Sequence, residues 1–162
     1  MNFQQHINKE TATINNFFNT QEEITVSKLH NEGFNCYDAI ITSASTTNPS
    51  KLYGIVEAKT RGINHDTYDG GVLLQLDKLN SVKQALNNAK NKPENINKTL
   101  KAFYLVQYND YTYLFDLDNV NYGKLQSKKL PKNTASDGSS EWIFKDIFLL
   151  QPSDALITTK TR

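Results

Sequence analysis

Two apolar segments separated by a polar stretch constrain the fold more than any other feature of the sequence. Residues 37–43 include the adjacent pair Ile40 and Ile41, and residues 52–59 contain the aromatic and β-branched side chains that strands favour. The stretch 45–50 between them is polar and contains a proline, which suits a hairpin loop. The sequence therefore predicts an antiparallel pair of strands.

Charged residues occupy the ends of these two apolar segments. Asp38 lies at the start of the first segment, and Glu57 and Lys59 lie at the end of the second. Because side chains alternate along a strand, Glu57 and Lys59 share a face and the side chain of Ala58 points to the other. A half-buried charge is costly unless it is paired or binds a metal. Asp38 and Glu57 therefore form a candidate site for Mg²⁺ or Mn²⁺, which prefer oxygen ligands, and the carbonyl of Ala58 could add another.

Lys59 would stand beside such a metal. In phosphodiester hydrolysis a metal polarises the phosphate and lowers the pKa of a bound water, while an ammonium group orients the nucleophile or neutralises developing negative charge. The alternative is an exposed hairpin on which Asp38, Glu57 and Lys59 form a surface ion pair, an interaction that stabilises a fold little.

Apolar residues at helical spacing predict two helices. The first covers residues 3–18, and Glu10 falls within its apolar stripe. The second should end near Asn91, before Pro93, and its stripe is formed by Val72, Leu76, Leu79, Val82 and Leu86.

Further strands are expected on both sides of the second helix. Residues 24–29 alternate weakly, and the Asn-Glu-Gly at 31–33 resembles a turn. Residues 102–108 and 112–117 are aromatic and β-branched, and the intervening Asn109-Asp110 suits a tight hairpin. The expected order is helix, strands, helix, strands, which places the chain in the α/β class.

The length of 162 residues suits one domain, with a core over about 1–117 and C-terminal strands and a tail over 118–162. Within the latter we expect an exposed loop at 136–140, an apolar run at 142–150 and a fraying tail beyond Ser153.

Composition excludes several classes of protein. No stretch approaches the roughly 20 apolar residues that span a bilayer, and the polar start lacks a signal-peptide core, so we expect a cytoplasmic protein that does not enter a membrane. Cys36 is the only cysteine, which excludes an intramolecular disulfide and a cysteine-rich zinc site. The formal net charge of +1 neither favours nor opposes nucleic-acid binding.

Scarce arginine with abundant lysine, asparagine and isoleucine indicates an AT-rich coding sequence, as in a low-GC bacterium or its phage.

The acid at Asp38 followed by Glu57-Ala58-Lys59 resembles the D…(D/E)xK signature of the PD-(D/E)xK, or restriction-endonuclease-like, phosphodiesterases. The resemblance covers roughly residues 1–117, although Tyr37 stands where that family usually has proline. It implies a core of a helix, a three-stranded β-meander carrying the motif, a second helix and a further strand, with a mixed sheet flanked by helices. It also implies that Asp38 and Glu57 bind the metal and that Lys59 is the catalytic lysine.

Four further residues are candidates for this site. Glu10 resembles the first-helix acid that many members of the superfamily direct at the metal, and its alternative is a helix-edge residue in solvent. Gln75 and Lys78, expected on one side of the second helix, resemble catalytic and phosphate-binding residues of related nucleases, or are solvated. Arg61 could bind phosphate bidentately or form a surface salt bridge.

Other polar and aromatic residues have simpler interpretations. His65 and Asp66 follow the motif and could touch substrate, although a loop histidine is more often solvated. Strand tyrosines could stack bases but more often pack a sheet. The lysines near residue 130 could track a phosphate backbone, although solvated loop lysines are the more common case. These residues are Tyr104, Tyr108, Tyr111, Tyr113, Lys128, Lys129 and Lys132.

We therefore expect a nuclease that hydrolyses DNA, in preference to RNA, with Mg²⁺ or Mn²⁺. A chain of this length leaves little room for a separate recognition domain, so a homodimer or a partner protein would be a natural way to reach both strands. The competing hypothesis is a non-catalytic nucleic-acid-binding or assembly module with the same fold. A small-molecule enzyme lacks support because neither a Gly-rich phosphate loop nor a nucleophile elbow is present.

Overall fold

The computed structural model describes residues 3–30, 35–44, 52–67, 70–132 and 141–161. The turn expected at 31–33 and the loops expected at 45–50 and 136–140 lie outside these ranges. Among the described residues, no helix has the length and apolar character needed to cross a membrane.

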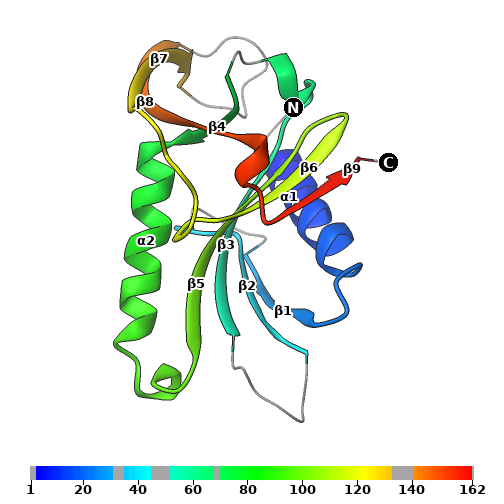
Figure 1. Cartoon of the computed structure of the whole chain (residues 1–162), viewed down its shortest axis with the longest axis vertical. Coiled ribbons are helices and arrows are strands. Elements are labelled where there is room, and N and C mark those ends of the chain that lie inside the picture. The colour runs from blue at the N-terminus through cyan, green and yellow to red at the C-terminus, as the bar shows by residue number, and fades with distance from the viewer. Residues whose placement is uncertain (1–2, 31–34, 45–51, 68–69, 133–140, 162) are drawn as a thin grey trace.

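A six-stranded mixed sheet forms the centre of the molecule (Figure 1). Its strand order is β1-β2-β3-β5-β6-β9, in which β3 and β5 pair in parallel and every other neighbouring pair is antiparallel. The strands are β1 (Ile24–Leu29), β2 (Ala39–Ser43), β3 (Leu52–Thr60), β5 (Thr99–Gln107), β6 (Tyr111–Asp116) and β9 (Ile157–Lys160). The predicted β2–β3 pair and the β5–β6 hairpin are both confirmed.

Two helices cover opposite faces of this sheet. Helix α1 (Phe3–Phe18) packs with Val56 and Ala58 of β3, whereas α2 (Leu76–Lys90) packs with Ile55 of the same strand. Since neighbouring side chains of a strand point to opposite faces, the helices lie on different sides. The predicted α/β class and the first helix are confirmed, and the central strands, buried on both faces, are apolar for that reason.

The second helix begins later than its apolar stripe predicted. Val72 belongs to β4 (Val72–Gln75), which forms a smaller sheet in the order β4-β8-β7 with β7 (Gln126–Pro131) and β8 (Trp142–Leu150). Residues 72–74 are fully buried and pair with β8, so an apolar run that also fits helical spacing is used as a strand. Gly71 precedes it at φ +140°, where a Cβ would lie 2.4 Å from the Leu150 carbonyl oxygen.

The expected fraying of the tail beyond Ser153 is wrong. Strand β9 pairs with β6 along its whole length, and the pairing is extended by hydrogen bonds from Leu156 N to Leu114 O and from Thr161 N to Asp110 O. The segment is ordered because β6 offers it an open edge and Ile157 packs against the core. Three short 3₁₀ turns complete the described structure: η1 (His65–Thr67), η2 (Pro93–Asn95) and η3 (Pro152–Asp154).

Candidate active site

The β2–β3 hairpin brings Asp38 to the end of β3. Asp38 lies just before β2, where its backbone N–H donates to the carbonyl of Val56 at 2.9 Å. Its carboxylate oxygen Oδ2 accepts a hydrogen bond from the backbone N–H of Ala58 at 2.7 Å. Ala58 stands between Glu57 and Lys59, so Asp38 is fixed beside both residues, as the hairpin prediction required.

Glu57 is the most deeply buried acid of this group, with 2% of its surface exposed. Its Oε1 lies 3.5 Å from Nζ of Lys59 and 3.3 Å from Nζ of Lys78, yet this atom makes no hydrogen bond within the described part of the chain. Burial raises the pKa of Glu57 to about 7, and the Asp38 charge adds to this rise while Lys59 and Lys78 oppose it. The site thus contains a carboxylate oxygen that has lost its water without gaining a full replacement.

Lys59 is held in place by a second acid. Its Nζ donates a hydrogen bond to Oε1 of Glu10, on α1, at 2.8 Å. Burial disfavours the Lys59 ammonium, but the charges of Glu57, Glu10 and Asp38 outweigh burial and raise the pKa of Lys59 above its ordinary value. Burial also raises the pKa of Glu10, against the opposing charge of Lys59. Lys59 is therefore a fixed cation at neutral pH.

Lys78 joins the group, and Gln75 does not. Lys78 lies in the first turn of α2 and reaches Glu57 while about a third of its side chain stays exposed. Gln75 is the last residue of β4, opposite Ile147, and not a helix residue as predicted. It has no hydrogen bond with Asp38, Glu57 or Lys59, all of which the structure describes. Gln75 was predicted to lie on the helix because the helix was expected to begin near Val72, but residues 72–75 form β4 and the helix begins at Leu76.

Arg61 is directed into the protein. Its Nη2 donates to the carbonyl of Leu73 at 3.1 Å and lies 3.5 Å from the hydroxyl of Tyr104, which itself donates to the Leu73 carbonyl at 3.0 Å. These contacts tie β4 to β5 across the two sheets. Arg61 therefore has a structural contact in place of the predicted bidentate phosphate contact. Its position two residues after Lys59 in the sequence did not indicate this direction.

His65 belongs to a different cluster. Its Nδ1 lies 2.7 Å from Oδ2 of Asp110, in the β5–β6 turn, and its ring packs edge-on against Tyr111. Ligand atoms of His65, Asp66 and Asp110 lie within 4.8 Å of one another, and in the described residues no other trio of His, Cys, Asp and Glu does so. The hydrogen bonds within this cluster explain it as a tie between η1 and the turn.

The remaining predictions concern packing and surface charge. Tyr104, Tyr108 and Tyr113 are buried, which confirms core packing over base stacking. Lys128 and Lys129 lie in β7 and not in a loop, and Lys132 forms an exposed pair with Glu141 at 3.1 Å. Because the prediction of a loop ignored the pairing of this segment with β8, it is wrong.

Comparisons with protein-family models, with curated proteins and with solved structures gave no match for this chain. The arrangement of Asp38, Glu57, Lys59, Glu10 and Lys78 therefore carries the functional argument by itself.

Proposed function

We propose that the protein is a metal-dependent phosphodiesterase that hydrolyses DNA at the Asp38–Glu57–Lys59 site. The observation that carries this proposal is Oε1 of Glu57, a buried carboxylate oxygen with no hydrogen bond from the described residues, beside a second carboxylate and a fixed ammonium group. A divalent cation between two such carboxylates would satisfy that oxygen.

Asp38 and Glu57 would hold Mg²⁺ or Mn²⁺. Mg²⁺ is commonly bound by one or two carboxylates, with water and substrate phosphate completing its coordination, so a pair suffices. When bound, such a metal polarises the phosphate and lowers the pKa of a coordinated water. Glu10 gives its carboxylate to Lys59, and we therefore assign it the positioning of that lysine in place of the metal ligation expected from the sequence.

The two lysines divide the remaining work. Lys59 presents a permanent positive charge to negative charge that develops on the phosphate. Glu10 fixes its direction, so little reorganisation is needed during the reaction. Lys78, which is partly exposed, would meet the phosphate backbone of a bound DNA strand.

The order of the elements supports a restriction-endonuclease-like core. Helix α1 is followed by the meander β1-β2-β3, then by α2 after the β4 strand, and then by β5, which pairs with β3 in parallel. Asp38 lies just before β2, and Glu57 and Lys59 lie on β3, which fits a β-meander that carries the motif. The extra β4-β8-β7 sheet extends this core.

The test is Mn²⁺-dependent cleavage of labelled single-stranded, duplex and branched DNA, with an RNA strand for comparison. We expect cleavage by the wild type and its loss in Asp38→Ala and Lys59→Ala, with the fold retained by circular dichroism. Lys83→Ala is the matched control. Lys83 also lies on α2, but its partner is Asp118 and not an acid of the site. A wild type that neither cleaves nor binds a divalent metal would favour the binding-module hypothesis.

A further inference from the structure

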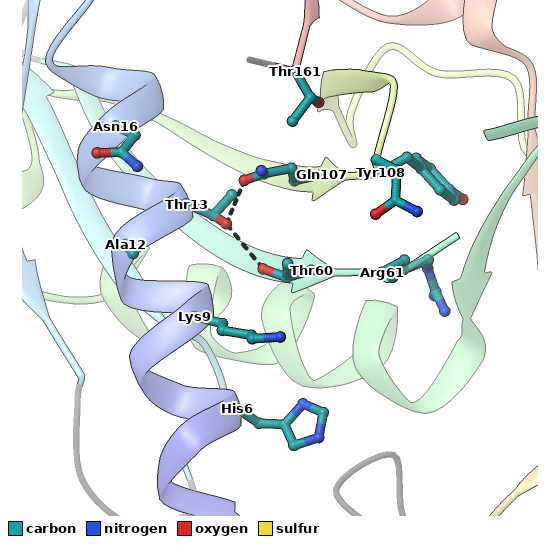
Figure 2. A pocket seen from close by; sticks show the side chains of 12 residues that line it. His6, Lys9, Ala12, Thr13, Asn16, Thr60, Arg61, Gln107, Tyr108 and Thr161 are labelled. Carbon is teal, nitrogen blue, oxygen red and sulfur yellow. Dashed lines mark hydrogen bonds between the residues drawn. The ribbon is translucent and has the colours of Figure 1, made fainter. Parts of the chain in front are cut away.

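A cavity of about 510 Å³ lies between α1 and the ends of β3 and β5 (Figure 2). Helix α1 contributes His6, Lys9 and Thr13 to its wall, and the strand ends contribute Thr60 and Gln107. In Figure 2 the side chains of His6 and Lys9 leave α1 on the side where the ends of β3 and β5 lie. Its volume is in the range of small-ligand pockets.

The cavity is a direct neighbour of the candidate active site. Thr60 follows Lys59 on β3, and Lys9 precedes Glu10 on α1, so the two elements that carry the Lys59–Glu10 pair also form the cavity. Alternation along β3 places Thr60 on the α1 face and Lys59 on the other. A nucleic-acid strand that contacts Lys59 and passes around the end of β3 would therefore reach the cavity.

The lining suits an anion. None of the described residues that form the cavity is Asp or Glu, and Lys9 supplies a cation. The pKa of His6 is lowered by burial and by the nearby charges of Lys9 and Lys59, which fits a positive potential at this wall.

The floor of the cavity is rigid. Thr13, which is 3% exposed, donates its hydroxyl to Oε1 of Gln107 at 2.6 Å and lies 2.9 Å from Oγ1 of Thr60. Figure 2 shows these bonds linking α1 to both strand ends. Because Gln107 accepts through Oε1, its amide nitrogen is the atom left to donate to a ligand.

We propose that this cavity binds the phosphate and sugar of the nucleotide adjacent to the bond that is cleaved. The inference rests on the proposed nuclease function and adds to it a subsite for a single nucleic-acid strand. Phosphate is favoured over a stacked base because most of the side chains that line the cavity are polar and the tyrosine among them, Tyr108, is buried in the core. Lys9 makes the charged contact, and Gln107 supplies a neutral donor.

The experiment measures binding of a fluorescein-labelled single-stranded DNA by anisotropy, in EDTA, as a function of salt. Lys9→Gln removes the charge, Lys9→Arg retains it, and Lys90→Gln removes a matched charge at the far end of α2. We expect Lys9→Gln to weaken binding about 5-fold or more and to reduce the salt slope by about 0.7, the value for one phosphate on a single strand. Lys9→Arg and Lys90→Gln should bind like the wild type.

Ala12→Leu is the second variant, because Ala12 is an exposed helix residue that lines the cavity and leucine retains helix propensity while filling space. It should weaken binding without changing the salt slope as much. Equal affinities for the wild type, Lys9→Gln and Ala12→Leu would overturn the subsite. If those variants also cleave with unchanged KM, the nuclease proposal survives alone; a wild type that neither binds nor cleaves DNA overturns both.

Discussion

Glu57 and Asp116 are two acids buried in the same sheet, and their surroundings differ. Asp116, on β6, is 6% exposed, and its carboxylate accepts hydrogen bonds from Lys101 at 2.6 Å, from the Asn119 amide at 2.8 Å and from the backbone N–H of Asp118 at 3.0 Å. Burial alone would raise the pKa of Asp116, but the bonds from Lys101 and Asn119 outweigh it and lower that pKa. Glu57 is less exposed, and one of its oxygens has no hydrogen bond to any residue that the structure describes.

The difference separates an acid that the fold completes from one that it leaves incomplete. The bonds to Asp116 join β5, β6 and the turn that follows, so its charge contributes to stability. Oε1 of Glu57 lies 3.5 Å from Nζ of Lys59 and 3.3 Å from Nζ of Lys78, too far for good hydrogen bonds. The ionised form of Glu57 therefore keeps a high free-energy cost. A perturbed acid beside a second acid and an exposed lysine is typical of a functional site.

The largest expected effect is on cleavage. Glu57→Gln removes one of the two carboxylates that we propose bind the metal, and we expect cleavage to fall by about 10³-fold, in line with the loss of a major electrostatic contribution to the transition state. Asp116→Asn should keep wild-type cleavage per folded molecule. Single-turnover rates on the preferred DNA measure both, and comparable losses in the two variants would remove the distinction between the acids.

The next effect is on the free energy of unfolding, where substitution of Asp116 should cost more than substitution of Glu57. Asp116→Ala leaves Lys101 and the backbone N–H of Asp118 without their acceptor, and we expect the free energy of unfolding to fall by about 3 kcal/mol. Glu57→Gln, measured in EDTA at pH 7.5, should lose much less or gain. Urea unfolding followed by circular dichroism gives both values, and a loss in Glu57→Gln as large as in Asp116→Ala would contradict the contrast.

Metal should stabilise the protein through Glu57. A cation at about 100 times its Kd raises the free energy of unfolding by about 2.7 kcal/mol if it binds only the folded state. We expect Mg²⁺ or Mn²⁺ to produce such a rise in the wild type and in Asp116→Asn, and none in Glu57→Gln or Asp38→Ala. Thermal unfolding across a metal titration tests this, and an equal rise in Glu57→Gln would place the metal elsewhere, with the His65–Asp66–Asp110 cluster the next group to mutate.

The smallest effect is a difference in pH dependence without metal. Because the pKa of Glu57 rises from 4.5 in the unfolded chain to about 7, its stabilising contribution is complete below pH 4.5 and is lost as the pH rises through 7. Between pH 5 and 7 in EDTA, the wild type should lose on the order of 2 kcal/mol relative to Glu57→Gln. The lowered pKa of Asp116 places its own dependence below this window, so Asp116→Asn should follow the wild type. Parallel curves for all three proteins would refute the assignment.

The sequence predicted those parts of the fold that depend on neighbouring residues. The β2–β3 hairpin, the β5–β6 hairpin and α1 each follow from patterns within a short window, and the common face of Glu57 and Lys59 follows from strand alternation. The position of Glu10 within an apolar stripe marked it as a candidate for the site, but its contact with Lys59 was not predicted.

Features that depend on distant pairing could not be predicted in this way. The run at Val72 satisfies helical and strand patterns equally, and only pairing with β8 decides between them. The edge strand β9 is polar on its exposed side and needs β6 to become ordered. The direction of Arg61 depends on the carbonyl of Leu73, which β4 presents, and the cavity depends on α1 meeting β3 and β5.

The parallel β3–β5 pair also affects the order in which the chain folds. Asp38 and Glu57 meet through a hairpin, a local contact that forms quickly, whereas β5 pairs with β3 only after β4 and α2 have crossed over the sheet. Lys78 travels with that crossover. We therefore expect the two acids to come together before Lys78 arrives, and closure of the long crossover to limit the rate of folding.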